Sequence, residues 1–434
     1  MVVVAAGALP INENPTLHFL QSTREEPTMR SSALILVTGT FLFAAMLPAM
    51  AEKKYGPGVT DTEIKLGQTM PYSGPASGLS LVGRIQSAYF KLINAQGGVN
   101  GRKINFVSLD DGFSPPKTVE QTRSLVEGEE ILAIFSSMGS APNLSVAKYL
   151  NSMHVPQLMA LAGTPKMIDP VNLPWTTTFY STLSLEAKEF AAYLLETKPN
   201  ARIGIIYQND ESGKTYLEGM KAGLGNKAAS MVVKEVAFDL TYPTIDSQIL
   251  LLQAAGADTV FFATVAPKFG AQGIRKSAEL GWKPLILLVP AASSLETALK
   301  PAGTQNAIGA MTSMFQKMSG DPKWEKDPAM LEYHAFMKQW APGEPAAEPL
   351  AMLGYITAQV MIDTLKRCGD ELTRENLLYQ ATHIKDLQLP LFVPGVKINM
   401  TPENRIPWRQ AQMARFDGTS WVFVGGIVSA PGEE

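Results

Sequence analysis

Two patterns of apolar and polar positions alternate along the chain from Thr62 onwards. The run "EIKLGQTM" is dense in apolar and β-branched residues, as in a strand, and the turn-rich loop "SGPASG" follows it. Between residues 81 and 93 apolar side chains recur three or four positions apart, which predicts a helix that ends at Gly97 and Gly98. "KINFVSLDD" then predicts a second strand. We therefore expect a strand, a helix and a strand in succession.

The alternation of helices and strands occurs in two separate series. The first continues with the helix "SPPKTVEQTRSLVEG", in which Ser114 is the expected N-cap and Pro115 the first helical residue. After Pro174, four helix-like segments precede four apolar runs, the last of which is "PLILLV". Strands that are apolar on both faces belong in parallel sheets covered by helices. The two series, divided near "PWTTTFYSTLS", predict an α/β fold with two doubly wound parallel-sheet lobes.

The last part of the chain follows a different pattern. "EYHAFMKQWAPG" and "LAMLGYITAQVMIDTLKRCG" have helical spacing, and "MARFDGTSWVFVGGIV" predicts a hairpin that turns at Asp417 and Gly418. No segment beyond the N-terminal region is both long and apolar enough to span a membrane.

The stretch "MRSSALILVTGTFLFAAMLPAMAEKK" has the pattern of a secretory signal. Arg30 precedes an uncharged apolar core of about 15 residues, and a small-x-small cleavage pattern ends at Ala51. This core is short for a spanning helix, which needs roughly 20 residues, although an uncleaved anchor and a buried helix are the alternatives. We expect residues 29–51 to be a signal peptide cleaved after Ala51. We then expect residues 1–28 to be a non-native, disordered extension.

Composition and charge narrow the class of protein. The chain has 37 Lys and Arg against 40 Asp and Glu, so no basic excess suggests a nucleic-acid partner. Cys368 is the single cysteine, which excludes an intrachain disulfide, and no cysteine follows the apolar core to carry a lipid. These features, together with export, indicate the periplasm.

The loops after the strands are rich in Ser, Thr, Gly, Pro and Ala. Ligands of open α/β sheets bind beyond the carboxyl ends of the strands, and with two lobes the cleft between them is the expected site. Hydroxyls and amide groups at helix N-termini suit an anionic group such as a carboxylate. Such residues are also ordinary turn and cap residues, which explains any one loop. The agreement of seven loops favours a binding site.

Motifs of enzymes are missing or incomplete. Ser114 and Ser145 each begin an S-x-x-K sequence, but the partner motifs of serine acylases do not accompany them. No nucleophile elbow, dinucleotide fingerprint or P-loop occurs. The histidines after the signal segment are far apart: His154, His334 and His383. We therefore expect no catalysis, no cofactor and no metal. Asp110 and Asp111 are expected to cap the sheet edge and the following helix.

Several motifs resemble one known family. "LGQTMPYSGPASG", "INAQGGVNGRKI", "DDGFSPPKTVEQTRSLVE" and "VPQLMALAGTP", in this order, are similar to the periplasmic ligand-binding proteins of the leucine/isoleucine/valine type. These are soluble receptors of ABC importers, and the resemblance extends from Tyr55 to Val428. It implies a type I periplasmic binding fold, in which two lobes joined by three hinge crossings close on a ligand. The closed form then docks on an inner-membrane permease.

The resemblance also implies lobe boundaries. The crossings would lie near residues 177–183, 310–318 and 389–397. The N-terminal lobe would then comprise residues 61–178 and 315–388, and the C-terminal lobe residues 179–314 and 389–428. We expect a monomer.

The ligand positions of the family can be transferred to the strand-end loops. The Ser140 hydroxyl and nearby amides would bind a ligand carboxylate, and Thr164 would add a hydroxyl. Tyr180 either stacks on an aromatic ligand or packs the hinge. The full set of expected site residues is Leu79, Ser80, Met138, Gly139, Ser140, Ala162, Gly163, Thr164, Tyr180, Ser212, Val265 and Ala291.

One position departs from the family pattern. Members that bind amino acids usually have a glutamate directly after the proline equivalent to Pro290, where it pairs with the ligand ammonium; here the residue is Ala291. A buried ammonium without a charged partner costs several kcal/mol, and the nearest carboxylates in the loops are Asp210 and Glu211. We therefore expect a carboxylate ligand with an apolar or aromatic body. The alternative is a branched-chain amino acid.

Overall fold

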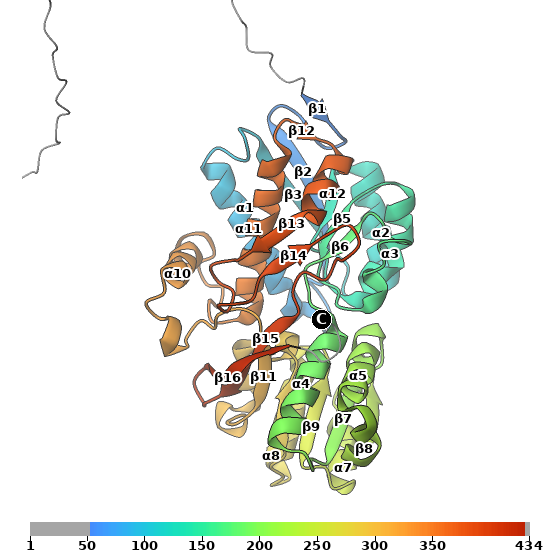
Figure 1. Ribbon diagram of the computed structural model, residues 1–434, viewed down its shortest axis with the longest axis vertical. Coiled ribbons are helices and arrows are strands. Elements are labelled where there is room, and N and C mark those ends of the chain that lie inside the picture. Colours follow the sequence, from blue (N-terminus) through green and yellow to red (C-terminus); the bar gives the residue numbers. More distant parts are fainter. Residues whose placement is uncertain (1–52, 430–434) are drawn as a thin grey trace, which may run out of the picture. The chain divides into compact units, whose positions relative to one another are not determined.

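The structure is a computed structural model that describes residues 53–429 (Figure 1). The expected signal peptide and the extension before it lie outside the described residues. Within the described range, no helix combines the length and the hydropathy needed to cross a membrane. A short pair of parallel strands, β1 (Lys54–Tyr55) and β12 (Glu371–Leu372), holds the start of this range against a segment far away in the sequence.

The first sheet has five parallel strands in the order β3-β2-β4-β5-β6. Their bounds are β2 (Glu63–Met70), β3 (Lys103–Asp110), β4 (Ala133–Phe135), β5 (Gln157–Ala160) and β6 (Thr176–Thr178). The helices α1 (Leu81–Ala95), α2 (Pro115–Arg123) and α3 (Ser140–Ser152) lie between successive strands. Three later helices complete this part, namely α10 (Pro328–Trp340), α11 (Pro349–Cys368) and α12 (Arg374–Thr382).

The apolar spacing of residues 81–93 creates the main helix–sheet core of this part. Ile85, Tyr89 and Ile93 are buried along one face of α1, which packs against α11. The ring of Tyr89 meets the ring of Tyr355 on α11 edge to face, with 5.1 Å between ring centroids. The helix α11 is thereby attached to the first sheet although more than 250 residues separate it from α1 in the sequence.

The second sheet has seven strands in the order β16-β15-β11-β10-β9-β7-β8. The parallel strands are β7 (Ile203–Gln208), β8 (Val232–Phe238), β9 (Thr259–Ala263), β10 (Leu285–Leu288) and β11 (Met311–Met314). The expected hairpin adds two antiparallel strands at the edge, β15 (Gln410–Phe416) and β16 (Trp421–Ser429). Its turn uses Asp417, whose carboxylate accepts from the amides of Thr419 and Ser420, and Gly418 at φ +109°.

Helices and short connections surround the second sheet. Their bounds are α4 (Leu183–Thr197), α5 (Glu211–Leu224), α6 (Ala228–Met231), α7 (Asp246–Ala254), α8 (Pro267–Glu279) and α9 (Lys300–Ala302). The arrangement confirms the predicted α/β class with parallel sheets. In Figure 1 the two sheets lie in opposite halves of the described part.

The chain passes between the two sheets three times. The first passage joins β6 to α4, and the second joins β11 to α10. The third runs from a two-stranded ribbon, β13 (Ile384–Leu387) and β14 (Ile398–Met400), to β15, so it lies later in the chain than residues 389–397. The guanidinium of Arg405 on this passage donates to the carbonyls of Pro174 and Thr176 at 2.9 and 2.6 Å. The lobe boundaries themselves stay a prediction.

An aromatic cluster joins the three passages. It consists of Phe179 from the first passage, Phe315 from the second, Trp408 from the third and Phe392 from the segment after β13. The ring centroids of Phe315 and Trp408 are 4.3 Å apart, and the other contacts span 5.2 to 5.3 Å. Offset and edge-to-face ring pairs of this kind stabilise a packed junction beyond the area that they bury.

Candidate functional site

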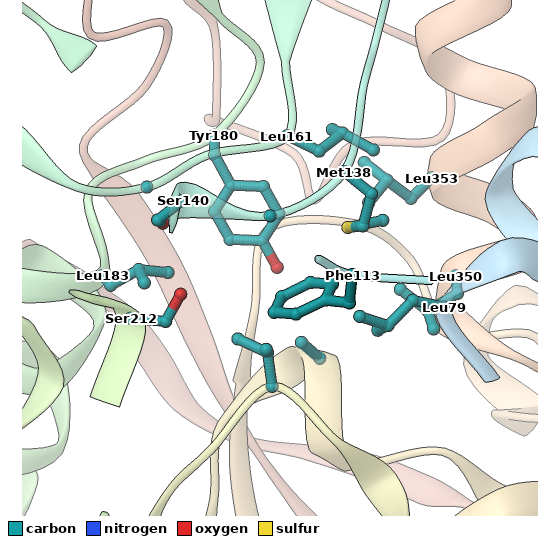
Figure 2. A pocket seen from close by; sticks show the side chains of 14 residues that line it. Leu79, Phe113, Met138, Ser140, Leu161, Tyr180, Leu183, Ser212, Leu350 and Leu353 are labelled. Carbon is teal, nitrogen blue, oxygen red and sulfur yellow. The ribbon is translucent and has the colours of Figure 1, made fainter. Parts of the chain in front are cut away.

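A small apolar cavity lies where the carboxyl ends of the two sheets meet. Its volume is about 30 Å³ (Figure 2). The lining comes from the loops after β2 to β6, from those after β7, β9 and β10, and from the start of α11. The lining residues are Leu79, Phe113, Met138, Gly139, Ser140, Leu161, Gly163, Tyr180, Leu183, Ser212, Val265, Ala291, Leu350 and Leu353.

Most of the expected site residues meet at this cavity. Those that line it are Leu79, Met138, Gly139, Ser140, Gly163, Tyr180, Ser212, Val265 and Ala291. Their convergence follows from the parallel arrangement, because strand ends that are far apart in sequence meet at one edge of each sheet. That they bind a ligand stays a prediction.

Three expected residues lie outside the lining. The Ser80 hydroxyl donates to the carbonyl of Ser77 at 2.6 Å and accepts from Arg84, so it stabilises the start of α1. Ala162 packs in a separate apolar cluster with residues such as Met167. The Thr164 hydroxyl donates to the Glu211 carboxylate at 2.8 Å. The local sequence around these residues is compatible with a site, but their side chains are engaged elsewhere.

Three hydroxyls supply the polar part of the cavity. They belong to Ser140, Ser212 and Tyr180, and none of them has a hydrogen-bond partner among residues 53–429. Burial raises the pKa of Tyr180 well above its usual range, so this phenol stays protonated and can donate. Figure 2 shows the Tyr180 hydroxyl reaching into the cavity whose wall includes the Phe113 ring. Hydroxyls in an apolar wall fix the position of a polar ligand group.

The N-terminus of α3 offers a place for an anion. Its N-cap is Gly139, at φ +100°, and no side chain caps the helix. The amides of Ser140 and Ala141 in the first turn therefore have no intrahelical acceptor, and the helix dipole favours negative charge beside them. The Ser140 hydroxyl lies at the same place.

The N-terminus of α5, on the opposite side of the cavity, is already capped. The Asp210 carboxylate accepts from the amides of Ser212 and Gly213 at 2.9 and 3.1 Å. Burial raises the pKa of Asp210. A second anion would be repelled here, so the helix α3 is the better partner for a ligand carboxylate.

No charged side chain lines the cavity in the part of the chain that the structure describes. The position after Pro290 is Ala291, which contributes only a methyl group. Glu211 accepts from the Thr164 hydroxyl at 2.8 Å and from the Lys166 ammonium at 2.9 Å. Since Asp210 and Glu211 both have partners, neither is free to neutralise a ligand ammonium.

The two bonds of Glu211 bridge the two sheets. Thr164 and Lys166 follow β5 of the first sheet, whereas Glu211 begins α5 beside the second. A second bridge lies at the start of α11, where the buried carboxylate of Glu348 accepts from the amide of Glu296 at 2.5 Å. Both bridges hold the two sides of the cavity together.

Two buried carboxyl groups lie on α4, whose first residue lines the cavity. Glu186 accepts from the Tyr216 hydroxyl at 2.6 Å, and burial raises its pKa to about 8. Burial, and then the neighbouring Glu186, raise the pKa of Glu189 well above its usual range. Neither carboxyl forms an ion pair with any residue in the described range. The same range contains no group of three or more His, Cys, Asp or Glu that could hold a metal ion.

The sequence reasoning missed five lining residues, which are Phe113, Leu161, Leu183, Leu350 and Leu353. Phe113 lies in the loop "DDGFSPP" after a predicted strand, so its position in the sequence could have identified it as a site residue. Leu350 and Leu353 reach the site from α11, which packs there through long-range contacts with α1. No local pattern marks these two leucines as site residues.

Comparison with solved structures places the fold. The protein resembles a branched chain amino acid ABC transporter protein from Thermus thermophilus with bound valine: the TM-score is 0.77 at 17% identity, over 86% of this chain and 98% of that one. It also resembles a solute binding protein from Rhodopseudomonas palustris BisB5 in complex with 3,4-dihydroxy benzoic acid. The TM-score is 0.71 at 18% sequence identity, and the match covers 86% of this chain and 98% of that one. A third similar structure is a fatty acid ABC transporter substrate-binding protein from Thermomonospora curvata. The TM-score is 0.72 at 21% sequence identity, and the match covers 87% of this chain and 95% of that one.

Sequence comparisons add one relative and a family. An "Amino acid binding protein" from Pseudomonas aeruginosa is 24% identical over 226 residues, which is 50% of this chain and 58% of that protein. The match thus spans little more than half the length of this curated relative. Residues 63–420 match the family model described as "Periplasmic binding protein". The chain therefore belongs to the periplasmic binding protein family and has the type I fold of its leucine/isoleucine/valine-binding members.

Proposed function

We propose that the protein is the periplasmic solute-binding component of an ABC importer and that its ligand is a small carboxylic acid with an apolar or aromatic body. The observation that carries the ligand class is the composition of the cavity. It combines free hydroxyls and an uncapped helix N-terminus with apolar side chains, and no charged side chain lines it within the described range.

The two ends of such a ligand have separate partners. The carboxylate would accept from the hydroxyl of Ser140 and from the first amides of α3, and the hydroxyls of Tyr180 and Ser212 would be further donors. The apolar body would lie against side chains such as Leu79 and Val265. Burying about 150 Å² of apolar ligand surface contributes roughly 4 kcal/mol, enough to drive binding without an ammonium contact.

The remaining parts of the proposal follow from the family. Its members bind small molecules and deliver them to membrane permeases, which supports transport rather than catalysis. We expect a monomer in the periplasm that binds its ligand without chemical change. The balanced charge of the chain gives no reason to expect a nucleic-acid partner.

A branched-chain amino acid is the second candidate. The Thermus thermophilus structure contains valine, and the Pseudomonas aeruginosa relative is described as an amino acid binding protein. Here an ammonium group would depend on backbone carbonyls and on the three hydroxyls, because Ala291 offers no charge.

A thermal-shift panel followed by isothermal titration tests the ligand class. Benzoate, cinnamate and branched keto acids are compared with leucine, isoleucine and valine. A ligand at 100 times its Kd stabilises the native state by about 2.7 kcal/mol. We expect stabilisation by the acids, whereas stabilisation by leucine, isoleucine or valine alone would contradict the proposed class. Conversion of any of them by the purified protein would contradict the absence of catalysis.

The variant Ser140→Ala tests the anion position. Loss of a hydrogen bond to a charged group costs about 1.5 kcal/mol, so we expect roughly tenfold weaker binding of the acid. Ser152→Ala, at the exposed end of the same helix, is the matched control and should bind as the wild type does. Equal affinities of the two variants would remove Ser140 from the site.

A further inference from the structure

Phe113 lies between two cavities. It lines the inner cavity of about 30 Å³ and also an outer cavity of about 210 Å³. The outer cavity is lined by Pro115, Ala141, Gln208, Asn209, Asp210 and Leu240 in addition to Phe113. Among the described residues, Phe113 is the one whose side chain belongs to both linings. Its ring therefore lies between a small apolar cavity and a wider cavity whose wall also contains amide and carboxylate groups. Figure 2 shows the ring in the wall of the inner cavity.

The backbone at Phe113 is held in an unfavourable conformation that aims the ring. Its φ is +61°, in the left-handed region that costs a bulky residue energy. The buried carboxylate of Asp111 accepts from the Phe113 amide at 2.9 Å and from the Thr118 hydroxyl at 2.9 Å. Asp111 thus holds the turn at Phe113 in place, and Thr118 on α2 holds the Asp111 carboxylate. A conformation retained against its own strain points to a constraint on the position of the ring.

Gly139 makes the space that the ring occupies. A Cβ atom at Gly139 would lie 2.6 Å from the ring of Phe113, so the ring would have to shift to make room for it. The ring consequently covers the N-terminus of α3, where the proposed carboxylate site lies. The inner cavity is closed on this side by one movable side chain rather than by backbone.

The inner cavity is so small that its wall limits the size of the ligand. A water molecule needs roughly 10–15 Å³ measured in this way, so about 30 Å³ accommodates about two. A larger ligand must displace part of the wall, either by separation of the two sheets or by rotation of the Phe113 ring. Rotation of the ring would join the inner cavity to the outer one.

We infer that the Phe113 ring is a gate that limits the length of the ligand, and this inference rests on the proposed function of the inner cavity. With the ring in place, separation of the two sheets makes room for compact bodies such as one aromatic ring or a short branched chain. Longer bodies would have to run through the ring toward Gln208 and Asn209. Without the ring, the combined space admits an extended chain whose far end reaches the outer cavity.

The test compares compact and long members of two ligand classes. The acids are benzoate and decanoate, and the amino acids are leucine and aminodecanoic acid. Phe113→Gly removes the ring and also suits the left-handed backbone, so it should fold; Phe113→Ala is the second variant. Leu353→Ala, in another part of the inner wall, enlarges the inner cavity without opening it to the outer one, and is the matched control. Thermal unfolding checks each variant before titration.

We expect the Phe113→Gly variant to bind the long member of the recognised class at least tenfold more tightly than the wild type does. It should bind the compact member more weakly, and Leu353→Ala should not gain the long ligand. An unchanged affinity for the long ligand, or an equal gain in Leu353→Ala, would overturn the gate. If leucine is bound and benzoate is not, the proposed ligand class fails while a gain for aminodecanoic acid still supports the gate. A wild-type protein that binds neither compact ligand overturns both.

Discussion

The carboxyl group of Glu186 makes the stability of the protein depend on pH. The side chain is 3% exposed on α4, and its one hydrogen bond is with the Tyr216 hydroxyl. Burial raises its pKa from 4.5 to about 8, while the bond from Tyr216 acts in the opposite direction and lowers it. In the unfolded chain the same group is hydrated and titrates near its ordinary value.

The size of the effect follows from the two pKa values. Between pH 4.5 and about 8 the folded chain keeps a proton on Glu186 that the unfolded chain has released. The folded state therefore binds more protons than the unfolded state, and its stability falls as the pH rises through this window. Each pH unit costs about 1.4 kcal/mol, so the free energy of unfolding falls by up to about 5 kcal/mol. This is a large part of the usual stability of a domain.

The variant Glu186→Gln removes the titration and keeps an acceptor for Tyr216. Urea unfolding at pH 5, 6, 7 and 8 should give similar stabilities for variant and wild type at pH 5. At pH 8 the variant should be the more stable protein by several kcal/mol. Glu189, whose pKa is also raised by burial, leaves a residual slope. Glu196→Gln, at an exposed position on the same helix, is the control and should follow the wild type. Parallel pH curves for Glu186→Gln and wild type would refute the reasoning.

Three further predictions follow from single contacts. Thr164→Val removes a hydrogen bond to Glu211 that joins the two sheets and is worth about 1.5 kcal/mol, so titration should show roughly tenfold weaker ligand binding. An unchanged affinity would mean that this hydrogen bond is absent in the ligand-bound form. Gly139→Ala places a Cβ atom 2.6 Å from the Phe113 ring at φ +100°, so it should lower the Tm by the equivalent of about 2 kcal/mol or more, and a wild-type Tm would contradict this. Arg405→Met leaves buried carbonyls unpaired and should cost about 3 kcal/mol or more in urea unfolding; a loss below about 1 kcal/mol would contradict the assigned bonds.

The fold could be predicted because each of its elements has a local signal. Both sheets are built from apolar runs that end in turn residues, and the Asp417-Gly418 turn between two apolar runs predicts the hairpin. The strand ends then meet by topology alone, which is why most of the expected site residues line one cavity.

Two features of the cavity could not be read from the sequence: the direction of individual side chains and the contribution of distant segments. Thr164 lies in the expected loop, but its hydroxyl points to Glu211, a partner that follows a strand of the other sheet. Leu350 lines the cavity because α11 packs on α1, a contact that no window of sequence contains. The local sequence therefore predicts which loops lie at the strand ends. The hydrogen bond that each side chain of such a loop forms depends on the tertiary structure.

The aromatic cluster at the three passages lies where we expect the protein to bend. Between β6 and α4 only four residues are outside regular structure, and Arg405 anchors the third passage five residues before β15. If one sheet rotates relative to the other, we therefore expect the pivot to lie beside Phe179 and Trp408. Tyr180, which lines the cavity, is the next residue after Phe179. We therefore expect a ligand that displaces Tyr180 to act close to this pivot, where a small change of angle produces a large displacement at the far ends of the sheets.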